Sequence, residues 1–398
     1  MKTATRSARG LSAQGRPCRL RSWREEAKTP TEEVSAGASK LLNVRPPAIV
    51  VDVGFVNGLS AIRSLRRAGV RVFAVDHKPS ALGFRSRYAT KVVAPSPLAD
   101  EEGFVEALRG LGPGVVFATH DEGLRAIARH RDSLELLCPF PRDLERLQKK
   151  RVQLDAALHT PDTRYPESAA EAVAAAEEIG YPVLLKPSEP VGFRQQYGKQ
   201  AVICHTGSEV EEAYRQTEPW EPMVQDLIPG GDDQLYTLGA YLSESLEPLG
   251  LFCGRKLIQT PPGIGTARLA EAVWVDEVVD AGLHLLRALG CNGLSQVEFK
   301  RDPRDGRFKL MEVNPRLWQW HSLARASGVD LPLIAYRDLT GEQVEAVRMN
   351  GGRRKWAILL MPGERPVVPR PPFVEATWAW RDPKPAVVHA VRALRRTK

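Results

Sequence analysis

A regular alternation of short apolar runs and helix-spaced segments, starting at Ala48, is the feature that most restricts the fold of this chain. AIVVDV is a short apolar run, GLSAIRSLRRAG has helical spacing and ends at Gly69, and VRVFAVD is a second apolar run ending at Asp76. KVVAP, EEGFVEALRGLG and VVFATHDEGLRAIARHR repeat the pattern. The alternation predicts a small parallel sheet flanked by helices over residues 46–143, with ligands gathering at the carboxyl ends of the strands.

Beyond residue 143 the pattern changes to a mixture of helices and antiparallel strands. LERLQKKRVQLDAALHT predicts one helix that ends before Pro161, and SAAEAVAAAEEIG predicts a second, capped helix. YPVLLKP, PMVQDLIPG and LYTLGAYL predict strands, VDEVVDAGLHLLRALG a helix, and LSQVEFKRDPRDGRFKLMEVNP a β-hairpin around a Pro-Arg-Asp-Gly turn. The predicted fold class is α/β and α+β, with a preliminary domain over 46–143, a second domain over 144–343 and a Pro-rich C-terminal extension over 344–398.

The net charge of +8 does not predict a nucleic-acid surface, because the excess lies near the two ends. Residues 1–44 hold nine basic and four acidic residues, and the last seven residues hold four more basic ones. The body between them is close to neutral, so no nucleic-acid partner is expected. The segment 1–45 predicts a disordered basic tail, although a transit peptide or a misplaced upstream start would share its composition.

Cysteine spacing and hydropathy indicate the compartment. The five cysteines lie far apart without a CxxC pair, which favours reduced thiols over disulfides or a structural zinc. No apolar stretch in the sequence approaches the roughly 18 residues that a membrane helix needs. We therefore predict a soluble, cytoplasmic protein with no membrane span.

The predicted hairpin carries the sharpest chemical signal. With its centre near Asp305, Glu298 and Glu312 lie opposite each other, and Asn314 follows on the same face. Like charges directly opposite are destabilising, so a divalent cation between the two carboxylates would explain the pair. Two carboxylates and an amide oxygen suit Mg²⁺, with phosphate oxygens completing its coordination. The alternative is that both glutamates face solvent.

The residues after the hairpin add a cation and an aromatic stretch. Arg316 lies on the metal face if the strand continues past Pro315, where its planar fork would hold a carboxylate or an acyl phosphate. A surface arginine is the alternative. Trp318, Trp320 and His321 would either wall a substrate pocket or pack in the core.

Two lysines upstream are candidates for nucleotide phosphates. Lys186 ends an apolar strand, and Lys150 lies at the start of the preceding unit, so together they supply two point charges. VQDLIPGGDD then provides a strand, a hinge and a glycine turn with Asp232 and Asp233. That stretch by itself predicts only an acidic loop.

These features, in this order, resemble the ATP-grasp superfamily over about residues 47–343. The order is a lysine, a second lysine on an apolar strand, a hinge strand, then Glu on one strand and Glu-x-Asn-x-Arg on the next. GGDDQLYTLGAYL, GRKLIQTPPGIGTARLAE and VEFKRDPRDGRFKLMEVNPRLWQWHSLA resemble the carboxylate–amine ligase group that includes D-aspartate ligase. The resemblance implies an ATP-grasp fold of two α+β subdomains over 144–343, preceded by the small parallel-sheet domain.

The resemblance also implies an activity and residue roles. The enzyme would use ATP and Mg²⁺, or Mn²⁺, to activate a small carboxylate as an acyl phosphate, which a small amine converts to an amide, and it could act as a homodimer. In this scheme the nucleotide is bound by Lys150, Lys186, Gln225, Asp226, Leu227, Ile228 and Asp233. The metal is held by Glu298, Glu312 and Asn314, and Arg316 steadies the acyl phosphate. Lys256 and Arg268 are weaker candidates for a place near the γ-phosphate or the acidic substrate. The loop PSEPVGFRQQYGKQAV departs from the usual glycine-rich lid, and Asp226 stands where glutamate is commoner.

Three alternatives remain at this point. The same fold would serve a carboxylase or a carbamoyl-phosphate type enzyme that activates bicarbonate. A nucleotide-dependent oxidoreductase built on the first β-α-β unit is a different class, but Val56 and Leu59 stand where GxGxxG needs glycine. A non-catalytic nucleotide-binding protein is the third.

Overall fold

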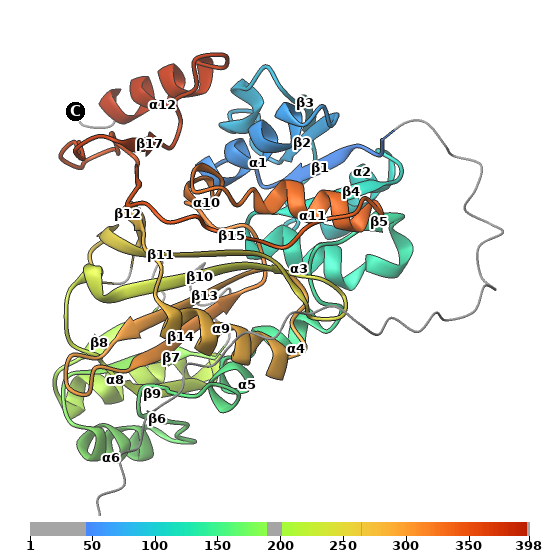
Figure 1. Cartoon of the computed structure of the whole chain (residues 1–398). Coiled ribbons are helices and arrows are strands. Elements are labelled where there is room, and N and C mark those ends of the chain that lie inside the picture. The colour runs from blue at the N-terminus through green and yellow to red at the C-terminus, as the bar shows by residue number, and fades with distance from the viewer. Residues whose placement is uncertain (1–44, 189–200, 264, 396–398) are drawn as a thin grey trace, which may run out of the picture. The chain divides into compact units, whose positions relative to one another are not determined.

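The computed structural model describes residues 45–188, 201–263 and 265–395, and these residues form three sheets (Figure 1). The predicted tail over residues 1–44 and residues 189–200 of the loop after Lys186 lie outside the described residues.

The first sheet is the predicted parallel one, and all of its pairings are parallel, in the order β3-β2-β1-β4-β5. Its strands are β1 (Ala48–Val51), β2 (Val72–Asp76), β3 (Thr90–Val93), β4 (Gly114–Ala118) and β5 (Leu136–Leu137). The accompanying helices are α1 (Val56–Arg67), α2 (Glu101–Arg109) and α3 (Asp121–Arg129), with the short 3₁₀ turns η1 (Gly83–Arg85) and η2 (Arg131–Ser133). The fold class predicted for this part is confirmed.

Strand β1 shows why this sheet is covered on both faces. Ala48 and Val50 pack in the core that includes α1, whereas Ile49 and Val51 pack in the core that includes α2 and α3. All four side chains are fully buried. Because alternate residues of a strand point to opposite faces, this continuous apolar run suits a strand between two layers of helices.

The second sheet is the largest and carries the predicted hairpin. It follows the order β14-β13-β10-β11-β12-β16-β17, with β15 pairing β11. Its strands are β10 (Leu235–Leu242), β11 (Pro248–Thr260), β12 (Thr266–Ala272), β13 (Gly293–Arg301), β14 (Phe308–Asn314), β15 (Val347–Arg348), β16 (Lys355–Ala357) and β17 (Phe373–Glu375). The helices after β12 are α9 (Asp276–Ala288), α10 (Ser322–Ala326), α11 (Leu331–Leu339) and α12 (Lys384–Arg395).

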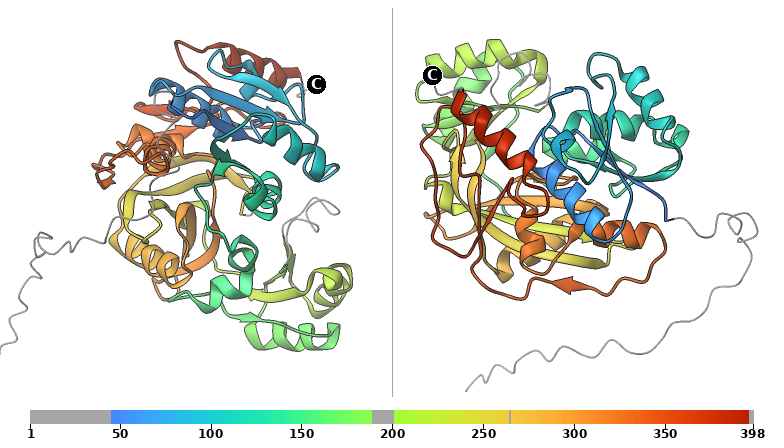
Figure 2. Two further views of the ribbon diagram at one scale, coloured as in Figure 1. Left: turned by 90° about the vertical axis from the view of Figure 1, so that its right-hand side faces the viewer. Right: turned by 90° about the horizontal axis from the view of Figure 1, so that it is seen from above.

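The third sheet is small and has helices on one face (Figure 2). Its order is β6-β9-β7-β8, with β6 (Thr163–Arg164), β7 (Val183–Pro187), β8 (Val202–Cys204) and β9 (Pro222–Asp226). Val183 and Leu185 of β7 pack against α6 (Ala169–Ile179) and α8 (Gly207–Thr217). Lys186 therefore points to the face opposite these helices. Two 3₁₀ turns, η3 (Glu218–Trp220) and η4 (Asp232–Gln234), flank β9.

The single helix predicted before Pro161 is wrong, because the structure has two short helices, α4 (Leu144–Gln148) and α5 (Lys150–Asp155). Lys149 between them is extended, with ψ of 120°. The Gln153 side chain of α5 donates to the carbonyl oxygens of Leu147 and Val313 and accepts from the Val313 amide. These bonds tie α5 to β14, so the break places Lys150 in the first turn of a helix that is fixed beside the hairpin.

Two further expectations concern thiols and membrane segments. The four described cysteines are free and buried, and burial raises the pKa of each thiol. Among the described residues, every helix is too short or too polar to cross a bilayer.

Candidate active site

The hairpin has the register that the sequence predicts at its two glutamates. Glu298 of β13 pairs with Glu312 of β14, and Gln296 pairs with Asn314. A bulge between Glu298 and Phe299 shifts the register toward the turn by one residue. Two carboxylates and an amide therefore lie side by side on one face of an antiparallel ladder.

Each of these carboxylates has a lysine of its own. Lys256 of β11 places its Nζ 2.8 Å from Oε1 of Glu298, and both side chains are about nine-tenths buried. Lys150 of α5 places its Nζ 3.3 Å from Oε2 of Glu312. The repulsion between the paired glutamates is thus offset by two cations that arrive from different elements.

Hydrogen bonds from two side-chain amides also hold the carboxylates. Gln296 donates from Nε2 to Oε1 of Glu298 at 2.8 Å, and Asn314 donates from Nδ2 to Oε1 of Glu312 at 2.9 Å. Burial by itself would raise the pKa of Glu312, but Lys150 and the Asn314 hydrogen bond outweigh it and hold the pKa well below its usual range. Glu312 is therefore an anion at neutral pH.

This donor set fits a hard divalent cation. Within the described ranges, no group of three or more His, Cys, Asp or Glu side chains is placed to hold a metal ion. Two carboxylates and an amide oxygen leave coordination positions for water and phosphate oxygens, as Mg²⁺ prefers. The set therefore suits a metal bound together with a nucleotide rather than a closed protein cage.

Lys186 lies on the face of the small sheet opposite the helices and is held by the hinge strand. Its Nζ donates to Oε1 of Gln225 at 2.8 Å, and Gln225 donates from Nε2 to Oγ1 of Thr163 at 3.0 Å. Burial lowers the pKa of Lys186 to about 8, with repulsion from Lys150 as a further cause. The two predicted phosphate-binding lysines are therefore close enough to influence each other.

The predicted hinge from Gln225 to Ile228 is fixed mainly through its backbone. The Asp226 amide donates to the Asp162 carbonyl at 2.8 Å, and Lys300 donates from Nζ to the Ile228 carbonyl at 2.7 Å. The Asp226 carboxylate is bound by the Arg304 guanidinium from the hairpin turn. Ile228 is buried, and Leu227 is partly buried.

Of the two acids after the hinge, Asp232 makes the structural contacts and the predicted Asp233 is exposed. The Asp232 carboxylate accepts from the Gln259 amide at 2.7 Å, from Gln259 Nε2 at 2.9 Å and from the Gly263 amide at 3.0 Å. These bonds fix the end of β11. The sequence offered no means of choosing between the two neighbouring acids.

Arg316 lies beside the hairpin, but not because the strand continues. Strand β14 ends at Asn314 and does not continue past Pro315. The guanidinium forks onto the Asp121 carboxylate at the start of α3, at 2.7 and 3.0 Å, and its Nη2 also lies 3.3 Å from Oδ1 of Asn314. Asp121, which the sequence analysis did not single out, thus connects the parallel sheet to the hairpin.

Arg268 stands apart from this group. It is buried in β12 and reaches Glu364 and the Arg365 carbonyl in the C-terminal extension. Among the contacts of the described residues, none joins Arg268 to Glu298 or Glu312.

The aromatic stretch packs in the core. Trp318 and Trp320 are buried and meet edge to face at 6.2 Å. A Cβ on Gly239 would lie 2.1 Å from Trp318, so the glycine is required for this packing. His321 places Nε2 3.0 Å from the Asn57 carbonyl, and burial lowers the pKa of its imidazole to about 4. A neutral, buried imidazole is not a proton donor near pH 7.

A second acidic group lies at the carboxyl ends of the parallel strands. Asp52 follows β1 with a positive φ of 63°, and its Oδ2 is buried without a hydrogen-bond partner. Burial, together with repulsion from the neighbouring Glu122, Asp76 and Asp121, raises its pKa to about 8. The sequence signal for this group is an acid directly after β1, an acid at the last position of β2, and two acids at the start of α3, which follows β4. These positions lie at the edge where ligands gather in parallel sheets.

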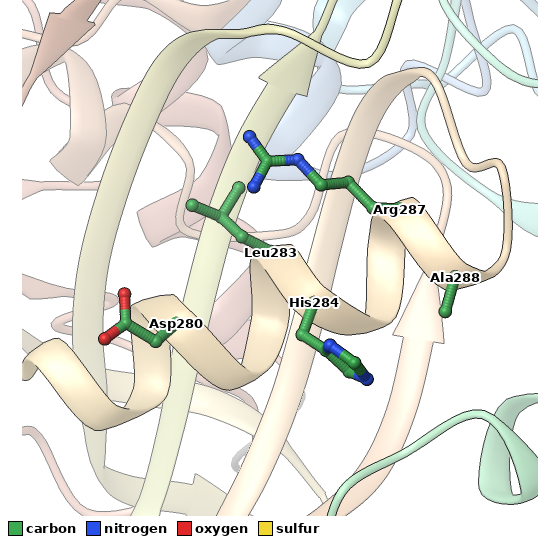
Figure 3. Close-up of a pocket in the computed structure, with 5 residues that line it drawn as sticks. All are labelled: Asp280, Leu283, His284, Arg287 and Ala288. Carbon is green, nitrogen blue, oxygen red and sulfur yellow. The ribbon is translucent and has the colours of Figure 1, made fainter.

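Two hollows of the described surface do not coincide with these groups. One depression of about 410 Å³ is lined by residues of α9 alone (Figure 3): Asp280, Leu283, His284, Arg287 and Ala288. Another of about 360 Å³ lies beside β6 and includes Asp162 and Lys309. Neither is lined by any of the predicted site residues, so the candidate site rests on contacts and charge.

Comparison with known proteins places the fold. Residues 267–347 match the family described as carbamoyl-phosphate synthase L chain, ATP binding domain. The carbamoyl phosphate synthase large chain of Methanothermobacter thermautotrophicus is 23% identical over 73% of this chain and 29% of its own length. The D-aspartate ligase of Enterococcus faecium is 28% identical over 40% of each chain. The chain spans between 21% and 40% of the length of the first curated relatives it matches.

A solved structure supports the same assignment. Biotin carboxylase from Campylobacter jejuni, solved as a complex with an ATP analogue, superposes with a TM-score of 0.61 at 16% identity. The superposition covers 75% of this chain and 72% of that chain. These likenesses confirm the fold that the sequence resemblance implied.

Proposed function

Starting from the ATP-grasp fold of this chain, we propose that it is an ATP-dependent ligase that joins a small carboxylate to a small amine through an acyl phosphate. The observation that carries the proposal is the carboxylate pair Glu298 and Glu312, with a lysine on each member. A structural ladder has no need for two opposed anions, whereas a nucleotide with its metal needs both anions and cations at one place.

The nucleotide is proposed to lie between the small sheet and the hairpin. Lys150 and Lys186 would contact its phosphates, and the hinge with Gln225, Asp226, Leu227 and Ile228 would border the adenine. Asp226 would have to exchange Arg304 for a ligand hydroxyl, and the exposed Asp233 completes the proposed nucleotide-binding set.

Mg²⁺, or Mn²⁺, is proposed to be held by Glu298, Glu312 and Asn314, and when bound it would neutralise charge on the phosphate oxygens. The protein's own groups prepare this place. Lys256 and Lys150 hold the two carboxylates ionised and oriented, and Gln296 and Asn314 fix their rotamers.

The proposed reaction needs no covalent bond between the enzyme and a substrate. A carboxylate oxygen of the acid attacks the γ-phosphorus of ATP, the bond to ADP breaks, and an acyl phosphate forms. The amine nitrogen then attacks the acyl carbon, a C–N bond forms, phosphate leaves, and the amine loses a proton. Arg316 and Lys256 are proposed to stabilise the negative charge that develops on the phosphoryl oxygens. Arg268 would take part only after release from Glu364.

The test is phosphate release from ATP and Mg²⁺ with hydroxylamine as a generic amine, across pooled carboxylic acids. Acid-dependent phosphate together with acyl hydroxamate is the expected result. Phosphate release that depends on bicarbonate alone would replace the ligase proposal with bicarbonate activation. Failure to bind ATP would overturn both.

We also propose how the chain is divided into functional parts, where the protein acts and how it assembles. The functional parts are residues 46–143, 144–343 and 344–398. The protein acts in the cytoplasm and as a homodimer. Cell fractionation and light scattering of the purified chain would check location and assembly.

A further inference from the structure

The C-terminal extension, residues 344–398, concentrates positive charge that the proposed chemistry does not use. It holds twelve basic and four acidic residues, whereas residues 45–343 hold 35 basic and 40 acidic ones. Three of the four acids are engaged within the fold. Asp382 is paired with Arg63, Glu364 with Arg268, and Glu375 accepts from the Thr377 amide. Eight of the ten basic residues that the structure describes in this segment are exposed, so most of their positive charge faces solvent.

The same segment exposes apolar side chains. Of the thirteen large apolar side chains that are exposed among the described residues, seven belong to the extension, which is about a seventh of the chain. Trp380 is the most exposed of all, at 86%. Isolated exposed apolar residues are ordinary, but a concentration of them marks an interaction surface.

Helix α12 arranges these features as an amphipathic surface. Val387, Val391 and Leu394 are 56%, 42% and 63% exposed, and their spacing of four and three residues puts them on one face. Lys384 and Arg395, both exposed, lie next to this stripe by the same periodicity. A positively charged helix with an exposed apolar stripe is typical of a segment that lies in a membrane interface.

The opposite side of α12 is fastened to the protein, so the stripe cannot turn inward. Ala393 is buried, His389 places Nε2 2.9 Å from the Leu360 carbonyl, and Arg392 donates to the Ser80 carbonyl at 2.7 Å. Figure 2 shows α12 at the outside of the chain.

The loop before α12 is anchored as firmly. Arg63 donates from Nε to the buried Asp382 carboxylate at 2.9 Å and from Nη1 to the Thr377 carbonyl at 2.8 Å. Trp378 and Trp380 lie between these two anchored positions and meet edge to face at 5.4 Å. Trp380 is thus held at the surface by its neighbours.

We propose that the C-terminal extension docks this protein on an anionic lipid bilayer. The stripe of Val387, Val391 and Leu394 enters the boundary between headgroups and acyl chains, and Trp380 lies at headgroup level. Lys384 and Arg395 contact anionic headgroups. This is peripheral binding through a surface helix and needs no spanning segment.

The positive charge and the apolar stripe of the extension argue against a second copy of the chain or a nucleic acid as its partner. A second copy that pairs by two-fold symmetry would bring two positively charged surfaces together. A nucleic acid would match the charge, but it would leave the apolar stripe and Trp380 without a partner.

The test is co-sedimentation of the full chain with vesicles of phosphatidylcholine and phosphatidylglycerol, compared with vesicles of phosphatidylcholine alone. We expect at least about tenfold tighter binding to the anionic vesicles, and weaker binding as salt is raised. Val391→Glu and Trp380→Ala should each lower the binding several-fold. Leu98→Glu, which adds the same charge at a side chain 57% exposed outside the extension, is the matched control and should bind as the parent does.

Several results would overturn the proposal. These are equal binding to neutral and anionic vesicles, no binding to either, or the same loss in the Leu98→Glu control as in Val391→Glu. A change of mass in light scattering on Val391→Glu, without vesicle binding by the parent, would assign the stripe to a second copy. Salt-dependent binding to duplex DNA or RNA without vesicle binding would assign the charge to nucleic acid.

Discussion

Two groups of neighbouring carboxylates in this molecule have opposite electrostatics. On the hairpin, Glu298 and Glu312 each have a lysine, and the pKa of Glu312 is held low. At the end of β1, Asp52 is buried beside other acids. Among the ion pairs of the described residues none includes Asp52, and its pKa is raised to about 8. The difference shows that burial by itself does not decide the charge of a carboxylate; what decides it is whether the fold brings a cation from another element.

The largest effect is expected from removing one charge of the hairpin pair. Glu312→Gln keeps the shape but leaves one anionic ligand and an uncompensated Lys150, so turnover should fall about 10²–10³-fold with the fold retained. Steady-state phosphate release would measure it. Glu211→Gln, at an exposed i,i+4 pair with Arg215, is the matched control. Unchanged turnover in Glu312→Gln would remove the metal assignment.

The next effect tests whether the lysines are structural partners of the carboxylates. Lys256→Met leaves the buried Glu298 without its cation, which should lower the free energy of unfolding by about 3 kcal/mol. Urea denaturation would measure this, and Mg²⁺ should restore more stability to the variant than to the parent. The exposed Arg215→Met should cost less than about 1 kcal/mol. An equal cost for both variants would mean that the buried pair has no special role.

A pH profile should distinguish Lys186, a proposed phosphate contact, from Lys150 and Lys256, which are paired with glutamates. Because burial lowers the pKa of Lys186 to about 8, its positive charge is lost as the pH rises through that value. ATP affinity should therefore weaken above about pH 8, by at most tenfold per pH unit, in titration calorimetry. Lys186→Arg stays charged and should show a flat profile. A flat profile in the parent chain would exclude Lys186 as a phosphate contact.

The smallest effect concerns the second acidic group. The folded-state pKa of Asp52 lies above its ordinary 3.8, so the folded state binds the proton more tightly and stability is lost as the pH rises from about 4 to about 8. Asp52→Asn tolerates the positive φ and should remove this slope, so the stability of the variant should change less between pH 4 and pH 8 than that of the parent. Unfolding at both pH values would check it. Equal slopes in parent and variant would mean that Asp52 is ionised in the folded state with an ordinary pKa.

The local features were predictable and the long-range pairings were not. The glutamate register follows from a period of two and a recognisable turn, and the parallel sheet follows from alternating apolar runs and helices. The break at Lys149 was missed because its neighbours favour helix, and only the bonds of Gln153 to β14 explain it. The pairing of Arg316 with Asp121 joins residues 195 positions apart, which no local pattern encodes.

The same applies to the choice between a site and the core. From the sequence, Trp318 and His321 fitted a pocket wall and core packing equally well. The close approach of Gly239 to the indole shows that Trp318 packs in the core. Lys256 was a weak candidate in the sequence because its partner Glu298 lies two strands away across β10.

Strand β16 has a consequence for how this protein can be shortened or fused. It covers the edge of β12, where Leu269 pairs with Ala357, and the loop that follows supplies Asp382 to the buried Arg63. A chain cut at residue 343 would present the bare edge of β12, which is a template for intermolecular strand pairing, and would leave a buried guanidinium without its carboxylate. The boundary suggested by proline content is therefore not a place to divide the molecule. Tags and fusion partners belong beyond α12, and a fragment of this chain that ends at residue 343 is expected to aggregate.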